Sequence, residues 1–243
     1  MNHSPLSQFE IKSIYDFFIF GIKLSITNIG LILAISTFSC IAFLYFSMKK
    51  SIKSPSYSQI LIELIYNAIL DMVGSTIGLK KGKNFIPIIF TVFCFILSCN
   101  FFGMLPYSFA STSHISITLS ISCILFLIII ISGFAYNGLR FFKIFLPPSC
   151  PYWLAPLMIL IEFFSFLSKP FSLSIRLAAN ITSGHVLLHV ISSTLLAQYF
   201  FPKLVAFPFM MIIIAFELCV SLLQAYIFSV LTCVYISDVL DLH

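Results

Sequence analysis

Charged residues are scarce in this sequence. Only 9% of its 243 residues are Asp, Glu, Lys or Arg, whereas 60% are hydrophobic, and the mean hydropathy is +1.10. A soluble domain usually carries about 25% charged residues, so this scarcity excludes an ordinary soluble fold. The net charge of +5 comes from lysines in short clusters, not from a basic stripe interleaved with aromatic residues, which gives nucleic-acid binding little support. The composition predicts an all-α integral membrane protein.

Disulfide and metal signatures are also missing. The seven cysteines lie mostly within apolar runs, and none forms a CxxC pair or a zinc-like spacing. We expect free, buried thiols and neither a metal nor another cofactor. The first 16 residues lack the features of a cleaved signal or an Arg-rich transit peptide, so no removable presequence is expected.

Long apolar runs are what the sequence has in abundance. About 20 apolar residues are enough for a helix to cross the hydrocarbon layer. Two such runs span residues 85–103 and 117–138, and an earlier one spans residues 17–48. These predict three ordinary membrane-crossing helices.

Two later runs are much longer than a single crossing requires. They span residues 152–199 and 204–240. The first would give a helix of roughly 70 Å, more than twice the hydrocarbon thickness, and contains only Pro170 as a break, which kinks a helix more readily than it reverses one. We predict a long, tilted helical hairpin that turns near residue 200, making about five crossings in one membrane domain, residues 1–243.

Residues 55–79 show a different periodicity. Polar residues recur at every fourth position, with apolar residues beside them, at Gln59, Glu63, Asn67, Asp71 and Ser75. This pattern predicts an amphipathic helix. The helix either lies on the membrane surface or is a short connector packed on the other spans, and the sequence favours neither.

Lysine placement predicts the orientation. The loops around the amphipathic helix and after the third crossing hold Lys49, Lys50, Lys53, Lys80, Lys81, Lys83, Arg140 and Lys143. The loop of residues 103–114 has no basic residue. By the positive-inside rule, the N-terminus lies outside and the C-terminus inside.

Arg176 lies near the middle of the first long run. An intramembrane charge costs about 2.5–3.5 kcal/mol to insert, so its default interpretation is functional. Glu162, Lys169 and Arg176 are seven residues apart and Asn180 follows one turn later, which places all four near one helix face.

The remaining ionisable and amide groups lie on both long helices, and their positions can be compared by depth in the membrane. His185 and His189 share a second face of the first long helix, whereas Glu217, Gln224 and Asp238 lie on the second. The two histidines have the HxxxH spacing of zinc ligands, but their run offers no third ligand, and proton handling fits a membrane site better. In an antiparallel hairpin, residues equally far from the turn have similar depths, which matches Arg176 with Gln224, His185 with Glu217 and Glu162 with Asp238.

This layout predicts two aqueous half-channels that do not meet. Glu162 and Asp238 belong to the inner half of the membrane, and His185, His189 and Glu217 to the outer half. Arg176 lies between the two sets, and a guanidinium that keeps its charge would separate them.

The two motifs SIRLAANITSGH and FELCVSLLQAYIFSVL resemble subunit a of the F-type ATP synthase, also called ATP synthase subunit 6. Further likeness comes from NFFGMLPYSF and EFFSFLSKPFSLSIR, and it extends over nearly the whole chain. The opening SPLSQFEI and the pair of His185 with Glu217 are similar to mitochondrial members. The resemblance therefore implies the mitochondrial inner membrane, with the N-terminus toward the intermembrane space and the C-terminus toward the matrix.

The resemblance also implies a role for each residue. Arg176 would be the charge barrier facing a carboxylate of the rotating c-subunit ring, and Gln224 would be its partner. The half-channel groups would be Glu162, Asn180, His185, His189, Glu217 and Asp238. Such a subunit carries no covalent active site. Its partners would be the c-ring, other membrane-sector and peripheral-stalk subunits, and the transported protons.

Two other classes of protein also use intramembrane charges. A secondary transporter or cation channel usually shows internal repeats, which are not found between the halves here. A purely structural subunit would tolerate apolar residues at Arg176 and Glu217. The inner lysines could meet anionic lipid such as cardiolipin or simply be solvated, and we favour solvation.

Overall fold

The computed structural model describes residues 11, 13–19, 22–48, 56–104, 111–145, 153–195 and 200–240. They divide into two compact units, which are described separately below. Unit 1 contains Met1–Pro55, Cys94–His114 and Leu177–Ala225, and unit 2 contains Ser56–Phe93, Ile115–Arg176 and Tyr226–His243. Within the described ranges, five helices are long and apolar enough to cross a membrane, which agrees with the predicted all-α membrane fold.

Unit 1 begins with a β-hairpin that the sequence analysis missed. Strands β1 (Ser13–Ile19) and β2 (Ile22–Thr27) pair antiparallel, so the predicted helical start at residue 17 is wrong. The segment IKLSIT alternates apolar and polar residues, which is the period of a strand and not of a helix. Helix α1 (Asn28–Met48) starts where Thr27 Oγ1 accepts a hydrogen bond from the Gly30 amide at 3.4 Å.

The rest of unit 1 consists of parts of three more helices and one turn, which meet one another and α1 through small polar groups. It contains the end of α4 (Ile86–Gly103), the turn η2 (Ser111–Ser113), the second half of α6 (Ala155–Leu195) and the first part of α7 (Phe200–Leu240). Helix α1 meets α4 where the Ser36 hydroxyl lies 3.3 Å from Cys99 Sγ. Thr182 of α6 donates to the Ser113 carbonyl at 3.3 Å. Such short polar groups hold helices together where no water competes.

Unit 2 has the larger apolar core. It contains α2 (Tyr57–Thr76), α3 (Leu79–Gly82), the start of α4, α5 (Ile115–Asn137), η3 (Gly138–Phe145), the first part of α6 and the end of α7. The buried side chains of this core include Ile69, Val73, Ile89, Ile129, Phe141 and Val239. Gly138 has φ 53°, a left-handed conformation that ends α5 and turns the chain into η3.

Helix α2 packs one face on protein. Its Thr76 carbonyl accepts a hydrogen bond from Ser237 at 3.0 Å, and Met72 lies 3.7 Å from the Cys233 thiol. On this face, α2 is therefore a connector helix packed on other helices of the protein. On the other side Tyr57 and Leu64 are exposed, so contact with lipid remains compatible with the structure.

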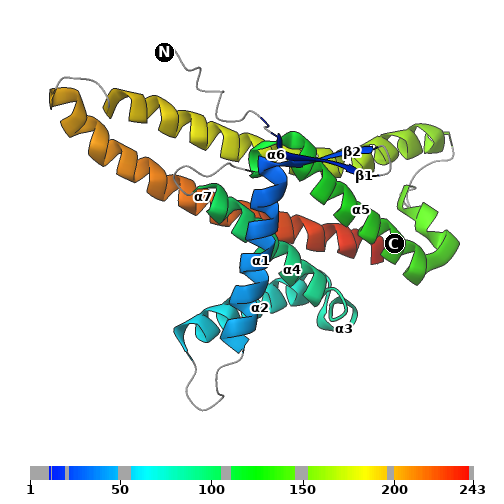
Figure 1. Ribbon diagram of the computed structural model, residues 1–243. Helices are drawn as coiled ribbons and strands as arrows, with labels where there is room; N and C mark the ends of the chain where they lie inside the picture. The colour runs from blue at the N-terminus through cyan, green and yellow to red at the C-terminus, as the bar shows by residue number, and fades with distance from the viewer. Residues whose placement is uncertain are drawn as a thin grey trace. The chain divides into compact units, whose positions relative to one another are not determined.

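Helices α6 and α7 are the two longest in Figure 1, with 41 residues each. Each is about 60 Å long, twice the thickness of the hydrocarbon layer, so neither could lie upright within it. Pro170 lies inside α6 and Pro208 inside α7, where a proline removes one backbone hydrogen bond and bends a helix. The prediction of two unusually long helices is confirmed.

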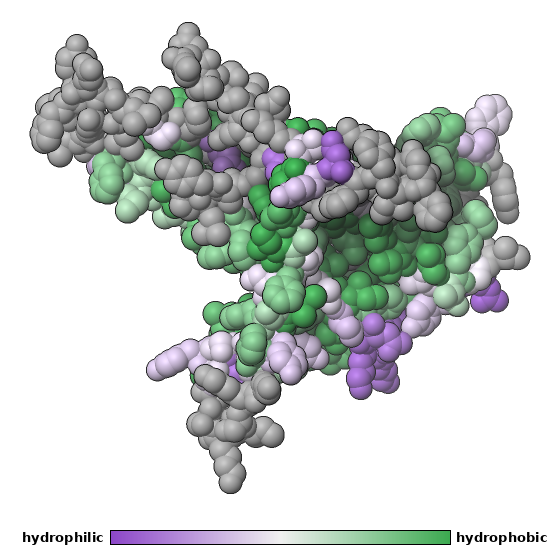
Figure 2. All heavy atoms as spheres, viewed as in Figure 1, coloured by the Kyte–Doolittle hydropathy of each residue, from purple (hydrophilic) through white to green (hydrophobic). Residues whose placement is uncertain are grey.

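The surface of the helices is mostly apolar. Figure 2 shows hydrophobic side chains over the long helices and hydrophilic ones gathered over α3, where Lys80, Lys81 and Lys83 are exposed. Large side chains such as Phe38, at 75% exposure, point outward, as expected for a protein whose surroundings are lipid. Lys49, Lys50 and Lys53 of the first lysine cluster, and the Lys143 side chain, lie outside the described residues.

Candidate functional site

The predicted site residues are divided between the two units, with α6 and α7 contributing to both. Unit 2 holds Glu162, Arg176 and Asp238, and unit 1 holds Asn180, His185, His189, Glu217 and Gln224. The acidic groups predicted for the inner half of the membrane thus fall in one unit, and the histidines and glutamate predicted for the outer half fall in the other. The matching of Arg176 with Gln224 stays a prediction.

Arg176 lies on an open face of α6. Its side chain is exposed, and so are Ser172 and Ala179, one turn before and nearly one turn after it. Leu173 and Leu177, which flank Arg176 on one side around the helix, are buried. Among the described residues no carboxylate pairs with Arg176. The result is a cation on a face of small residues, which a second molecule could approach closely.

Two hydrogen bonds hold α6 just ahead of this arginine, both from α5. The Thr118 hydroxyl lies 3.0 Å from the Ser174 hydroxyl, and Ser122 donates to the Pro170 carbonyl at 3.0 Å. Both contacts join α5 to the part of α6 that directly precedes Arg176.

Glu217 is buried in unit 1 and lies against α6. Its side chain is 6% exposed, and both carboxylate oxygens have no hydrogen-bond partner among the described residues. It fills the space beside Gly184, where an added Cβ would lie 2.5 Å from Oε1. Gly184 directly precedes His185, so the predicted depth of Glu217, level with His185, agrees with the structure.

The histidine side of α6 meets the end of α4. The His185 ring donates a hydrogen bond to the Gly103 backbone. Asn180 is partly exposed, one turn from Arg176 on α6. His189 lies in α6, but its side chain is outside the description. Among the described residues no group of three or more His, Cys, Asp or Glu is placed to hold a metal ion.

A polar face of α7 continues from Glu217 through Ser221 to Gln224. These residues are four and three positions apart and therefore lie on one side of the helix, and each is buried. Asn100 of α4, fully buried, places its Nδ2 3.5 Å from the Ser221 carbonyl. Asn100 is not among the site residues predicted from the sequence, although an amide within an apolar span is a signal that could have found it.

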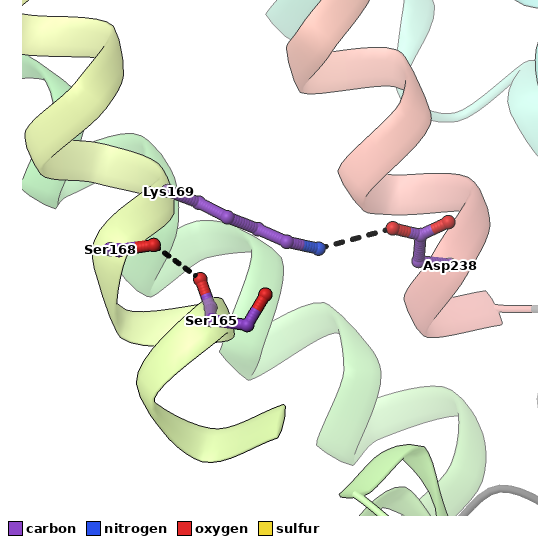
Figure 3. A network of polar contacts seen from close by, with 4 residues as sticks. All are labelled: Ser165, Ser168, Lys169 and Asp238. Atoms are coloured by element: carbon purple, nitrogen blue, oxygen red, sulfur yellow. Dashed lines mark hydrogen bonds and ion pairs between the residues drawn. The ribbon is translucent and has the colours of Figure 1, made fainter. Parts of the chain in front are cut away.

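Asp238 of unit 2 has a partner that the depth argument did not predict. Lys169 Nζ lies 3.1 Å from Asp238 Oδ2, whereas the depth argument matched Asp238 with Glu162, two turns away from Lys169 on α6. Figure 3 shows the lysine reaching across from α6 to α7, with Ser168 and Ser165 beside it. The Lys169 ammonium also lies 5.3 Å from the Phe166 ring centroid and 4.5 Å from that of Tyr235. Such aromatic faces stabilise a cation.

The chain thus has titratable groups in each unit and a permanent cation on an open helix face. This chemistry suits the binding and release of protons. A comparison with known families gives an independent result. The sequence profile of the ATP synthase A chain family matches residues 29–237.

Proposed function

Because this chain belongs to the ATP synthase A chain family, we propose that it is the stator that carries protons to and from a rotating ring of c subunits. As a family member it is a subunit of the membrane sector of ATP synthase and works with other subunits of that complex. The family also favours this role over a secondary transporter. The proposal adds the path of the proton and the residues along it.

The observation that carries the proposal is the exposed guanidinium of Arg176 on a small-residue face of α6. Each ring subunit would bring one ionised carboxylate to this face, and the cation would attract it. Guanidinium keeps its proton at any physiological pH, so it cannot pass protons along. Arg176 would therefore stop a direct leak while it lets the ring carboxylate pass.

Two dead-end half-channels would deliver the protons. Asn180, His185, His189 and Glu217 would form the outer one, and Glu162 and Asp238 the inner one, with Gln224 as the polar partner of Arg176. The separation of these groups into two compact units supports this assignment. A proton that enters from outside would neutralise a ring carboxylate, travel with it around the ring, and leave on the inner side.

The membrane potential would then drive rotation. Moving one charge through the potential yields about 2.3 kcal/mol per 100 mV. We place the protein in the mitochondrial inner membrane, with its N-terminus toward the intermembrane space and its C-terminus toward the matrix. The exposed lysines of α3 would lie on the matrix side, where they are solvated or meet anionic lipid such as cardiolipin. The peripheral stalk would hold the chain still while the ring turns.

The test uses membranes that contain the assembled complex. Arg176→Ala should abolish ATP synthesis driven by a proton gradient, because the cation is lost. Arg176→Lys should also abolish it, because an ammonium can lose its proton when it is buried against the ring. Arg140 is exposed in η3, outside the proposed path, so Arg140→Lys is the matched control and should leave synthesis unchanged. Appreciable coupled synthesis by Arg176→Ala would overturn the proposal.

A further inference from the structure

Asp238 lies between two α7 residues that are each hydrogen-bonded to another helix of unit 2. The Ser237 hydroxyl donates to the Thr76 carbonyl of α2 at 3.0 Å. On the other side of Asp238, the Val239 carbonyl accepts a hydrogen bond from Asn137 Nδ2 of α5 at 2.7 Å. Two helices that are distant in the sequence thus hold α7 on either side of the aspartate.

Both hydrogen bonds lie at helix ends. Helix α7 ends at Leu240, α5 ends at Asn137 and α2 ends at Thr76. The last four carbonyls of an α-helix have no amide partner within the helix, so the carbonyls of Thr76 and Val239 are left for donors from outside. Ser237 and Asn137 supply these two donors. The ends of α2 and α7 are therefore completed by side chains of other helices.

The carboxylate of Asp238 depends on the last turn of α7 for its position. The end of a helix is the part that opens most easily, because few bonds hold it. Asp238 lies two residues before the end of α7, and its side chain is 49% exposed. Val239, directly after it, is fully buried. The bonds of Ser237 and Asn137 therefore close the turn that carries an accessible acidic group.

The partner of this carboxylate is held separately, on α6. The Lys169 ammonium lies 4.5 Å from the Tyr235 ring centroid and 5.3 Å from that of Phe166. Figure 3 shows the lysine reaching from α6 to Asp238, at 3.1 Å from Oδ2. Opening of the last α7 turn would move the aspartate and leave the lysine on α6. The ion pair therefore exists only while that turn stays closed.

We propose that Asn137 and Ser237 are positioning residues for Asp238 in the inner half-channel. Their two hydrogen bonds keep the end of α7 helical, and so keep the carboxylate where protons leave for the inner side. An amide and a hydroxyl do this without taking up or releasing a proton themselves. The inference rests on the proposed function, which places Asp238 on the inner path, and it gives α2 and α5 a part in proton release.

The experiment measures two quantities on the whole complex, with Asn137→Leu and with Ser237→Ala. The first is hydrogen exchange of the backbone amides at 237–240. Loss of one hydrogen bond of typical strength shifts a closed–open equilibrium about fivefold, so exchange should become about fivefold faster in either variant. Asn137→Gln, which keeps an amide donor, should restore most of the native protection. Native exchange in both Asn137→Leu and Ser237→Ala would overturn the proposal.

The second quantity is the rate of gradient-driven ATP synthesis per assembled complex. Because a turn that is open more often presents the carboxylate less often, Asn137→Leu and Ser237→Ala should each lower this rate about twofold or more. Asn137→Gln should again recover most of it. Faster exchange at 237–240 with a native rate of synthesis would show that the position of Asp238 is not critical, and would contradict the proposal.

A double variant separates positioning from general stabilisation. Because Glu162 remains on the inner path, Asp238→Asn should keep a residual rate of synthesis. If Asn137 acts through Asp238, adding Asn137→Leu to Asp238→Asn should change that residual rate little. A purely structural role of Asn137 would give the same fold-change with and without the aspartate, and that result would count against the proposal.

Asn84 provides the matched control. Its Nδ2 donates to the Tyr136 hydroxyl at 3.2 Å at an exposed site of the same unit, beside the end of α5. Asn84→Leu should leave both the exchange at 237–240 and the rate of synthesis unchanged. If Asn137→Leu prevents assembly, Ser237→Ala, which removes a single oxygen atom, decides the question by the same two measurements.

Arg176→Ala in the same assay separates the two hypotheses. If it stops synthesis while Asn137→Leu and Ser237→Ala keep the native rate, the inference about Asp238 is wrong and the proposed function stands. If Arg176→Ala keeps the native rate, the proposed function itself is wrong, and the inference falls with it.

Discussion

The carboxylate of Glu217 occupies the space that a side chain at position 184 would need. A Cβ added to Gly184 would lie 2.5 Å from Glu217 Oε1 and 2.7 Å from its Cδ. Both residues belong to unit 1, Gly184 in α6 and Glu217 in α7. The absence of a side chain at position 184 therefore allows the acidic group to lie directly against α6, one residue before His185.

Gly184→Ala should disturb function more than stability. The atoms in the way are the end of a flexible side chain, which can turn aside at little cost, but the carboxylate then leaves its place against Gly184 of α6. We expect assembled complex close to the native amount and proton uptake reduced severalfold. Gly184→Val should reduce proton uptake further. Proton uptake by vesicles that contain either variant complex checks both expectations. A native rate in Gly184→Ala would show that the position of the carboxylate is not critical.

Gly133→Ala should behave in the opposite way. A Cβ there would collide with Val239 Cγ1 and would lie 2.7 Å from the Phe141 ring, both in the buried core of unit 2. Overpacking of a core costs about 1–3 kcal/mol. We expect a lower thermal denaturation temperature of the purified complex, with a near-native rate for the molecules that assemble. Equal stability of the Gly133→Ala and native complexes would mean that this core yields more easily than its packing indicates.

The ion pair of Lys169 with Asp238 should contribute modestly to stability. The lysine side chain is 19% exposed and the aspartate 49%, and pairs with access to solvent contribute about 0.2–1 kcal/mol. We expect Lys169→Met and Asp238→Asn each to lower thermal stability slightly, with little further loss in the double variant. The charge-reversed pair, Lys169→Asp with Asp238→Lys, should recover part of the loss. Strict additivity of the two single changes would exclude a direct interaction.

Helix existence and type could be predicted from the sequence because long apolar runs have few alternatives in a membrane. The run at 85–103 corresponds to helix α4, Ile86–Gly103, and the run at 117–138 corresponds to helix α5, Ile115–Asn137. The error fell on residues 17–27, where an apolar average hid the period of two that forms a β-hairpin. The hydropathy of a short segment does not distinguish a strand from a helix.

The candidate site was predictable wherever one residue carried the signal by itself. Arg176 and Glu217 stand out because a charge in an apolar run is costly. Asn100 was missed because its partner, Ser221, is 121 positions away. Glu162 was matched with Asp238 in depth only, whereas the ion pair of Asp238 is with Lys169. Equal distance from a turn gives a depth and does not say which side chains meet.

The hydroxyl pair of Thr118 and Ser174 should act as a small clamp between α5 and α6. Both groups are buried, their oxygens are 3.0 Å apart, and Ser174 lies two residues before Arg176. Hydrogen bonds between membrane helices contribute about 0.6 kcal/mol on average, so Thr118→Val and Ser174→Ala should each lower the thermal stability of the complex only slightly. The double variant should lose little more than either single one, because one lost partner already breaks the bond. Coupled ATP synthesis should persist in all three, since the backbone of α6 and not this bond carries the guanidinium. Synthesis abolished by Thr118→Val in a fully assembled complex would show instead that the clamp sets the position of Arg176.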